Sequence, residues 1–278
     1  MSRRIGIMQG RLTLPVGERI QAFPAANWRG EFASAREAGL QSIEWIFDVD
    51  DEGVNPISTP EGIAEMLGLS AKYSVAVTSL CADYFMSEPL LRGNSGEREY
   101  RRVKLDWLIH QCFKASINRV VLPFVDHSQI SGEGDFRGLI SLLDDLLPQA
   151  ESSGVEIHLE TSLPPQRFAL LLAAVDHPFL KVNYDSGNSA SLGYLPEEEF
   201  TAYGRRIGSV HIKDRLRNGG TVPLGQGDAD FASLFHCLEK SGYQGDFILQ
   251  VARSAPGDEV AWARQNIAAL KRWLCPAS

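Results

Sequence analysis

The amino-acid sequence predicts a single (β/α)8 barrel domain that extends over residues 1–278. Eight short segments with the composition of β-strands recur along the chain, and segments with the apolar spacing of helices lie between them. This alternation predicts parallel strands, and eight repeats without a linker favour a closed barrel over an open sheet. The length agrees, because a closed barrel of this type needs roughly 250 residues.

The predicted strands and helices follow one another in order. The strand-like segments are residues 5–9, 42–47, 75–80, 119–125, 155–160, 181–185, 209–213 and 247–252. The clearest helical segments are residues 28–40, 98–115, 136–154, 164–175, 231–242 and 259–274. Gly39, Gly154 and Gly242 precede strands, as expected for helix C-termini. No GxGxxG or GxxxxGK(S/T) turn follows a strand, which disfavours a nucleotide-binding sheet.

Composition limits the classes of function. With 44% hydrophobic and 22% charged residues the chain is typical of globular proteins, which excludes disorder. A net charge of −8 would repel nucleic-acid phosphates, so we expect no nucleic-acid partner. The apolar runs are too short for a membrane span or a signal peptide, so we expect a cytoplasmic protein. The four cysteines form no CxxC pair, which predicts buried reduced thiols: Cys81, Cys112, Cys237 and Cys275.

The last four predicted strands place polar side chains in the barrel lumen. Apolar residues such as Ile157, Val182 and Val210 would face the helices, so their polar neighbours face inward. The inward polar residues nearest the C-terminal strand ends are Glu160, Asp185, His211 and Gln250. Because chemistry in such barrels lies at these ends, the four side chains predict a site for one divalent metal ion. Mg2+ or Mn2+ is expected before Zn2+, since three of the four donors are oxygens and none is a thiolate.

The sequence motifs around these residues resemble those of the sugar phosphate isomerase/epimerase superfamily of xylose-isomerase-like TIM barrels (AP endonuclease family 2). The resemblance spans nearly the whole chain. It rests on GIMQGRL at the first strand, IEW in the second, HLET, NYDSGN and VHIKD around the first three predicted ligands, and PLGQGDADF after them. It implies a small sugar or sugar phosphate as substrate, and an isomerase or epimerase reaction through a metal-stabilised enediolate.

Residue 250 departs from the pattern of these epimerases. In the family, a glutamate at this position is the fourth metal ligand and also exchanges a proton with the substrate carbon. An amide oxygen can still ligate a hard cation, but glutamine cannot accept a proton at neutral pH. We therefore expect Glu160 to act as both ligand and base. The proton would return from Lys213 or from an acid near Asp83, Asp126 or His127.

Four further residues are predicted to bind the substrate: Glu44, Asn188, Arg217 and His127. Glu44 and Arg217 resemble residues that relatives use on substrate, and Asn188 follows Asp185 where endonuclease relatives have a histidine. His127 lies on the loop after the fourth predicted strand. The basic residues that follow strand ends are candidates for contact with a phosphate or carboxylate: Arg11, Lys213, Arg217 and Arg253.

Other functions remain compatible with parts of the sequence. An endonuclease would need histidine ligands after the third and fourth strands, where this chain has Asp83 and Asp126. A dehydratase of cyclic polyols or acids would use the same metal and the same first proton abstraction. A non-catalytic sugar-binding barrel would follow if Gln250 abolishes proton return. By analogy with barrels of this kind, a homo-oligomer is also expected.

Overall fold

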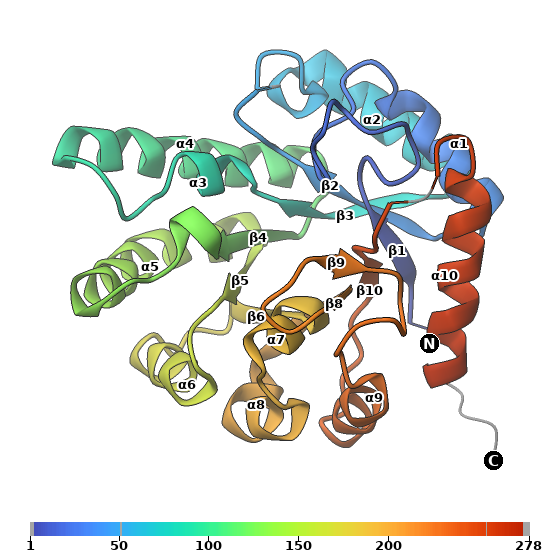
Figure 1. Ribbon diagram of the computed structural model, residues 1–278. Coiled ribbons are helices and arrows are strands. Elements are labelled where there is room, and N and C mark those ends of the chain that lie inside the picture. Colours follow the sequence, from blue (N-terminus) through green and yellow to red (C-terminus); the bar gives the residue numbers. More distant parts are fainter. Residues whose placement is uncertain (1–2, 51, 254, 275–278) are drawn as a thin grey trace.

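The computed structural model describes residues 3–50, 52–253 and 255–274, and Figure 1 shows helices arranged around a central barrel. Eight parallel strands close in the order β1-β10-β7-β6-β5-β4-β3-β2. They are β1 (Ile5–Met8), β2 (Ser42–Ile46), β3 (Ala76–Cys81), β4 (Arg119–Phe124), β5 (Glu156–Thr161), β6 (Leu180–Asp185), β7 (Ile207–Ile212) and β10 (Phe247–Leu249). The predicted (β/α)8 barrel is therefore confirmed, and each strand-like segment overlaps one barrel strand.

The helices cover the outside of the barrel (Figure 1). They are α1 (Trp28–Ala38), α2 (Pro60–Tyr73), α3 (Tyr84–Ser87), α4 (Ser95–Lys114), α5 (Glu133–Ser153), α6 (Pro165–Ala174), α7 (Ser186–Leu192), α8 (Pro196–Tyr203), α9 (Phe231–Lys240) and α10 (Glu259–Leu274). The predicted helical segments correspond to α1, α4, α5, α6, α9 and α10. The helix α10, red in Figure 1, packs beside α1 and completes the ring.

Local geometry fixes several helix ends. The helix α4 begins at a capping box, in which the Asn94 side chain accepts a hydrogen bond from the Glu97 amide and Glu97 accepts one from the Asn94 amide. The helices α1 and α5 end at Gly39 and Gly154, whose φ angles of 86° and 65° lie in the left-handed region that favours glycine. Gly242, with φ of 70°, follows the last turn of α9. The glycine signals in the sequence therefore mark true helix ends.

The hydrophobic core lies between the barrel and the helices. Trp45 of β2 packs against Trp28 and Phe32 of α1, with ring centroids 5.6 and 6.3 Å apart. Outward residues of the strands, including Ile157 and Val210, are fully buried in the same cluster. This packing supports the strands whose C-terminal ends carry the predicted site residues.

A short hairpin outside the barrel follows β7. The strands β8 (Asp214–Arg215) and β9 (Thr221–Val222) pair in antiparallel fashion. The buried carboxylate of Asp214 accepts hydrogen bonds from the amides of Gly225, Gly227 and Ala229. The glycine-rich loop after the hairpin is thereby tied to the end of β7.

Two sequence expectations concern the described residues as a whole. Within those ranges, no helix combines the length and the apolar character that a membrane span requires. Cys81, Cys112 and Cys237 are free and buried. Cys275 lies outside the described residues.

Candidate metal and substrate site

A cavity of about 620 Å³ opens at the C-terminal ends of the barrel strands. This is the end at which (β/α)8 barrels carry their active sites, and the volume suits a small molecule. The walls come from the ends of β3, β4, β5, β7 and β10, from the β1–α1 loop and from the loop after β2. Charged side chains on the walls include Asp83, Glu160, Lys213 and Arg215.

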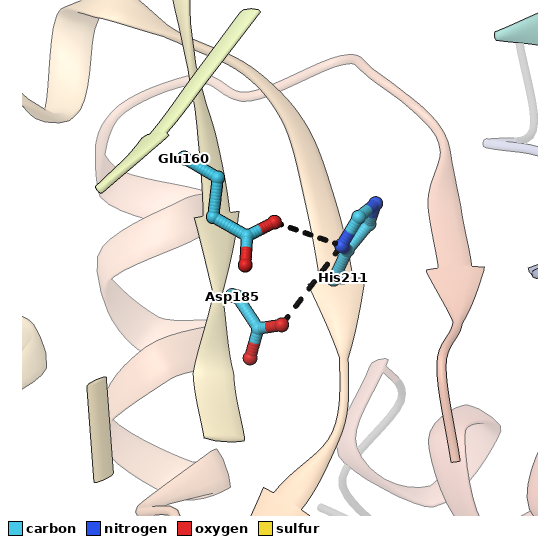
Figure 2. Close-up of side chains that lie close together, drawn as sticks. All are labelled: Glu160, Asp185 and His211. Atoms are coloured by element: carbon cyan, nitrogen blue, oxygen red, sulfur yellow. Dashed lines mark ion pairs between the residues drawn. The ribbon is translucent and has the colours of Figure 1, made fainter. Parts of the chain in front are cut away.

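Three of the predicted metal ligands converge beside this cavity. Glu160 lies near the end of β5, Asp185 ends β6 and His211 lies on β7, where it is the register partner of Asp185. One ligand atom from each lies within 4.8 Å of the other two. Figure 2 shows both carboxyl groups directed at the imidazole, whose Nδ1 lies 3.4 Å from Glu160 Oε2 and 3.9 Å from Asp185 Oδ2. Such a set of oxygen and imidazole donors is able to hold a divalent cation.

Gln250 is the fourth predicted ligand. It follows β10 and lines the cavity, and its Nε2 donates a hydrogen bond to Gln21 Oε1 over 3.0 Å. Its Oε1 is buried and has no hydrogen-bond partner among the described residues. A buried acceptor without a partner costs about 1–3 kcal/mol, a cost that a bound cation would remove. The residues present therefore fit a divalent metal ion.

Glu44 fixes the orientation of the histidine. Its Oε1 lies 2.6 Å from His211 Nε2, and both side chains are fully buried. Burial alone would lower the pKa of His211, but the carboxylates of Glu44 and Glu160 raise this pKa to about 10. Burial acts to raise the pKa of Glu44, but His211 outweighs this effect and lowers it. The contact occupies Nε2 and leaves Nδ1 facing the two carboxylates, as in metal sites where a carboxylate orients a histidine ligand.

Two asparagines hold the carboxylate of Glu160. Asn183 Nδ2 donates to Oε2 over 2.9 Å, and Asn188 Nδ2 donates to Oε1 over 2.6 Å. Burial acts to raise the pKa of Glu160, but the hydrogen bond and charge of His211 and the charge of Lys213 outweigh it and lower the pKa. Glu160 is therefore ionised at neutral pH, as a ligand or a base must be.

The predicted substrate residues occupy different places. Asn188 and Lys213 line the cavity, and the Lys213 ammonium lies 3.3 Å from Asn188 Oδ1. Glu44, Arg217 and His127 are not among the lining residues. Glu44 is buried against His211, and His127 is exposed on the 3-10 helix Asp126–Ser128. Of the four predicted substrate residues, Asn188 lines the cavity and the other three do not; Lys213, which was predicted to return a proton, lines it as well.

The hairpin explains why Arg217 lies elsewhere. Its guanidinium packs beside Gly193, whereas Arg215, two residues earlier, lines the cavity. Arg215 donates to Asn188 Oδ1 over 2.8 Å and to the carbonyl of Gly219. Arg215 could not be predicted from the sequence, because the alternation of strand residues no longer applies beyond the end of β7.

The loop between β1 and α1 was predicted to contribute Arg11, whereas other residues of the loop line the cavity. Arg19 and Gln21 from this loop line the cavity, and Arg19 forms ion pairs with Asp48 and Asp50 after β2. The length of this loop was the signal present in the sequence. Residues 9–27 exceed the roughly 12–15 residues beyond which loops are usually functional or disordered.

The closed parallel barrel, with a carboxylate–imidazole cluster at its C-terminal end that is able to hold a metal ion, defines the class of (β/α)8 barrel enzymes. Within this class, the chain belongs to the xylose isomerase-like TIM barrel family, whose model matches residues 32–273. This result confirms the resemblance drawn from the sequence motifs.

Relatives of known name cover nearly the same length. The chain is 24% identical over 272 residues to L-ribulose-5-phosphate 3-epimerase UlaE of Salmonella heidelberg (strain SL476), covering 92% of this chain and 94% of that protein. It is 23% identical over 271 residues to the protein of the same name from Escherichia coli O157:H7, with the same coverage of 92% and 94%.

Solved structures share the fold at low identity. An L-ribulose 3-epimerase superposes with a TM-score of 0.78 at 16% identity, covering 98% of this chain and 95% of that chain. D-psicose 3-epimerase from Clostridium cellulolyticum H10, solved with D-tagatose, gives a TM-score of 0.77 at 14% identity, with coverage of 98% and 99%. The IolI protein, solved with a zinc atom, gives 0.77 at 14% identity, with coverage of 99% and 100%.

Proposed function

We propose that the chain is a divalent-metal-dependent isomerase or epimerase of a small ketose or ketose phosphate. The observation that carries the proposal is the cluster of Glu160, Asp185 and His211 beside a cavity of about 620 Å³. The Oε1 of Gln250, which has no hydrogen-bond partner among the described residues, supports it. So do the sequence relatives, which are named L-ribulose-5-phosphate 3-epimerases.

The metal would be held by two carboxylates, one imidazole nitrogen and one amide oxygen, from Glu160, Asp185, His211 and Gln250. When bound, a divalent cation polarises a substrate carbonyl and stabilises the negative charge left by removal of a neighbouring proton. Mg2+ or Mn2+ is proposed ahead of Zn2+, because the donors are mostly oxygens.

Glu160 is the proposed base. Its lowered pKa keeps the carboxylate ready to accept a proton, and Asn183 and Asn188 hold both of its oxygens in place. The Lys213 ammonium lies 3.3 Å from the Asn188 amide oxygen and 3.5 Å from Asp185 Oδ2. From this position Lys213 would donate a hydrogen bond to a substrate oxygen, or would return a proton to the face of the substrate that Glu160 serves. Asn188 would bind a substrate hydroxyl.

A phosphorylated ketose is the favoured substrate class. The guanidinium of Arg215 lines the cavity, and its hydrogen bonds go to neutral acceptors, Asn188 Oδ1 and the Gly219 carbonyl. No salt bridge joins Arg215 to a carboxylate in the described part of the chain. An arginine without a carboxylate partner is suited to bind a phosphate group, since charge-assisted hydrogen bonds to phosphate are strong. Of the basic residues predicted for this role, Lys213 lines the cavity with Arg215, whereas Arg11, Arg217 and Arg253 do not line it.

Metal analysis of protein purified without chelator tests the first part of the proposal. We expect about one divalent ion per chain, lost in His211→Ala and retained in His127→Ala, whose histidine lies outside the cluster. Absence of bound metal, even after Mg2+, Mn2+ and Zn2+ are each added back, would reject the metal site.

Solvent exchange tests the chemistry. In D2O, a panel of ketoses and ketose phosphates should show deuterium incorporation next to the carbonyl of at least one compound, and Glu160→Gln should abolish it. Exchange followed by loss of water from the substrate would identify a dehydratase instead. No exchange on any compound by the metal-loaded protein would favour a non-catalytic sugar-binding barrel.

A further inference from the structure

Epimerisation requires proton carriers on both faces of the substrate. The proton leaves one face of the carbon, the intermediate is planar, and inversion requires that a proton return to the other face. Under the proposed function, Glu160 serves the first face. Gln250 has no proton to give at neutral pH, so a second carrier must come from elsewhere in the cavity.

Asp83 is linked to position 250 through one side chain. Gln250 Nε2 donates to Gln21 Oε1 over 3.0 Å, and Gln21 Nε2 donates to Asp83 Oδ2 over 2.7 Å. Asp83, Gln21 and Gln250 all line the cavity that Glu160 also lines. The linked residues therefore form one continuous part of its wall.

The middle of this wall lies opposite Glu160, and Asp83 lies at its nearer end, two strand steps from β5. In the closed ring, four strand steps separate β5, which carries Glu160, from β1 in either direction. Asp83 follows β3, Gln21 comes from the loop after β1, and Gln250 follows β10. The chain of hydrogen bonds thus spans the arc from β3 to β10 that contains β1. By contrast, Lys213 belongs to the hydrogen-bond group of Glu160 itself through Asn188.

The chemical state of Asp83 suits an acid. Its two carboxyl oxygens accept hydrogen bonds from Gln21 and from the Cys81 thiol, over 2.7 and 3.1 Å, and no salt bridge joins it to a cation in the described ranges. Burial raises the pKa of Asp83 to about 6, although these two hydrogen bonds lower it. A carboxyl group of this pKa is able to give a proton at neutral pH and to recover it from water.

The other aspartates of the cavity are less suited. Asp48 and Asp50 form ion pairs with Arg19. Asp126 lines the outer part of the cavity and belongs to a short 3-10 helix after β4. Asp83 is the partly buried aspartate of the cavity that forms no salt bridge among the described residues, although it interacts electrostatically with Arg11.

We propose that Asp83 is the second proton carrier, and that it protonates the substrate carbon on the face opposite Glu160, which makes the reaction an epimerisation. The Glu160 carboxylate takes the proton, and the C–H electron pair moves into the enediolate. The enediolate carbon then takes the proton of the Asp83 carboxyl group, the Asp83 O–H bond breaks, and the carbonyl is restored. Glu160 ends protonated and Asp83 ionised, and exchange with water resets both groups.

The test uses the metal-loaded full chain and the ketose or ketose phosphate that shows exchange with wild-type protein. In Asp83→Asn, formation of the epimer should fall at least about 100-fold, the usual effect of removing a general acid. Deuterium from D2O should still enter the remaining substrate, because Glu160 continues to remove and return the proton on its own face. The amide oxygen introduced by Asp83→Asn can still accept the hydrogen bond from Gln21, and unchanged metal content would show that the variant folds.

Two further variants complete the test. Asp144→Asn, at an exposed position on α5 outside the cavity, is the matched control and should retain epimer formation. Gln250→Glu in the Asp83→Asn background should restore part of it, by returning an acid to the same wall. Epimer formation by Asp83→Asn at the wild-type rate would overturn the assignment. So would a wild-type protein that converts the ketose to an aldose, if this activity is lost in Lys213→Met but not in Asp83→Asn. Absence of exchange in the wild-type protein is a separate result, which rejects the proposed function and the role of Asp83 with it.

Discussion

The carboxylate of Glu44 on β2 lies 2.6 Å from the Nε2 of His211 on β7, with both side chains fully buried. Glu44 was expected to bind substrate, but it is placed behind the histidine, where it does not line the cavity. Its position makes it a positioning residue for His211, because it holds the imidazole with Nδ1 toward Glu160 and Asp185.

Glu44→Gln should therefore weaken metal binding by about 10- to 100-fold, the usual effect of losing a hydrogen-bond partner of a metal-ligating histidine. Isothermal titration with Mn2+ measures the change directly. Glu65→Gln, on the outer surface of α2, is the control and should bind as wild type does. Equal affinity of Glu44→Gln and wild type would show that the imidazole is held by its other neighbours.

Arg215→Gln should raise the KM for a ketose phosphate by about 10- to 100-fold, the cost of one or two charge-assisted hydrogen bonds. The KM for the corresponding free ketose should change little. Arg217→Gln is a matched control, since Arg217 lies outside the cavity lining. Steady-state kinetics on both substrates distinguish the two arginines. A larger effect of Arg217→Gln would mean that the hairpin rearranges when substrate binds.

Gln250→Ala should weaken divalent-cation binding, because it removes a buried amide oxygen that has no hydrogen-bond partner in the described part of the chain. Gln250→Glu should strengthen it by about 10-fold or more, since a carboxylate replaces a neutral donor near the cation. Metal titration of both variants measures the effect. Gln129→Ala removes an amide at the exposed part of the same cavity and should leave affinity unchanged. Identical affinities in all variants would exclude residue 250 as a ligand.

Glu31 provides a pH-dependent prediction about stability. This fully buried residue of α1 accepts a hydrogen bond from the Gly10 amide over 2.6 Å, and burial raises its pKa from 4.5 to about 7. Between these values the unfolded chain has lost the proton while the folded chain keeps it, so stability falls as pH rises through this window. Across this window the free energy of unfolding should fall by about 3 kcal/mol, since each pKa unit corresponds to about 1.4 kcal/mol.

Glu31→Gln keeps the oxygen that accepts from Gly10 and removes the titration. The difference in free energy of unfolding between the variant and wild type should therefore be more favourable to the variant at pH 8 than at pH 4.5. Urea unfolding of both proteins at the two pH values measures this difference. Glu37→Gln, at an exposed position on the same helix, should show no such difference. A constant difference between Glu31→Gln and wild type at all pH values would mean that Glu31 is ionised in the folded protein throughout.

The strands of the barrel and the core of the site follow from the sequence because strand residues alternate strictly between two faces. Once Val182 and Val210 are taken as outward, Asp185 and His211 must face the lumen, and the closed ring brings them together. The same rule predicts which face of the sheet a side chain lies on, but not how far along the barrel axis it lies. It therefore placed Glu44 in the lumen without indicating that it lies behind His211.

The rest of the site depends on loops, where no such period applies. Arg215 reaches the cavity and Arg217 does not, because the pairing of Arg215 with Thr221 fixes the hairpin after β7. Gln21 is positioned by its contacts with Asp83 and Gln250, which are 62 and 229 residues away along the chain. Such positions depend on tertiary structure and have no counterpart in local sequence.

The contact between Glu44 and His211 also has a consequence for the order of folding. The two residues are 167 positions apart, so the half of the chain that carries all four proposed ligands lacks the carboxylate that orients the histidine. Full metal affinity should therefore develop only when β2 joins the barrel, and the strengthening of metal binding would time its closure. A separately expressed C-terminal half-barrel should bind metal more weakly than it does after association with the N-terminal half.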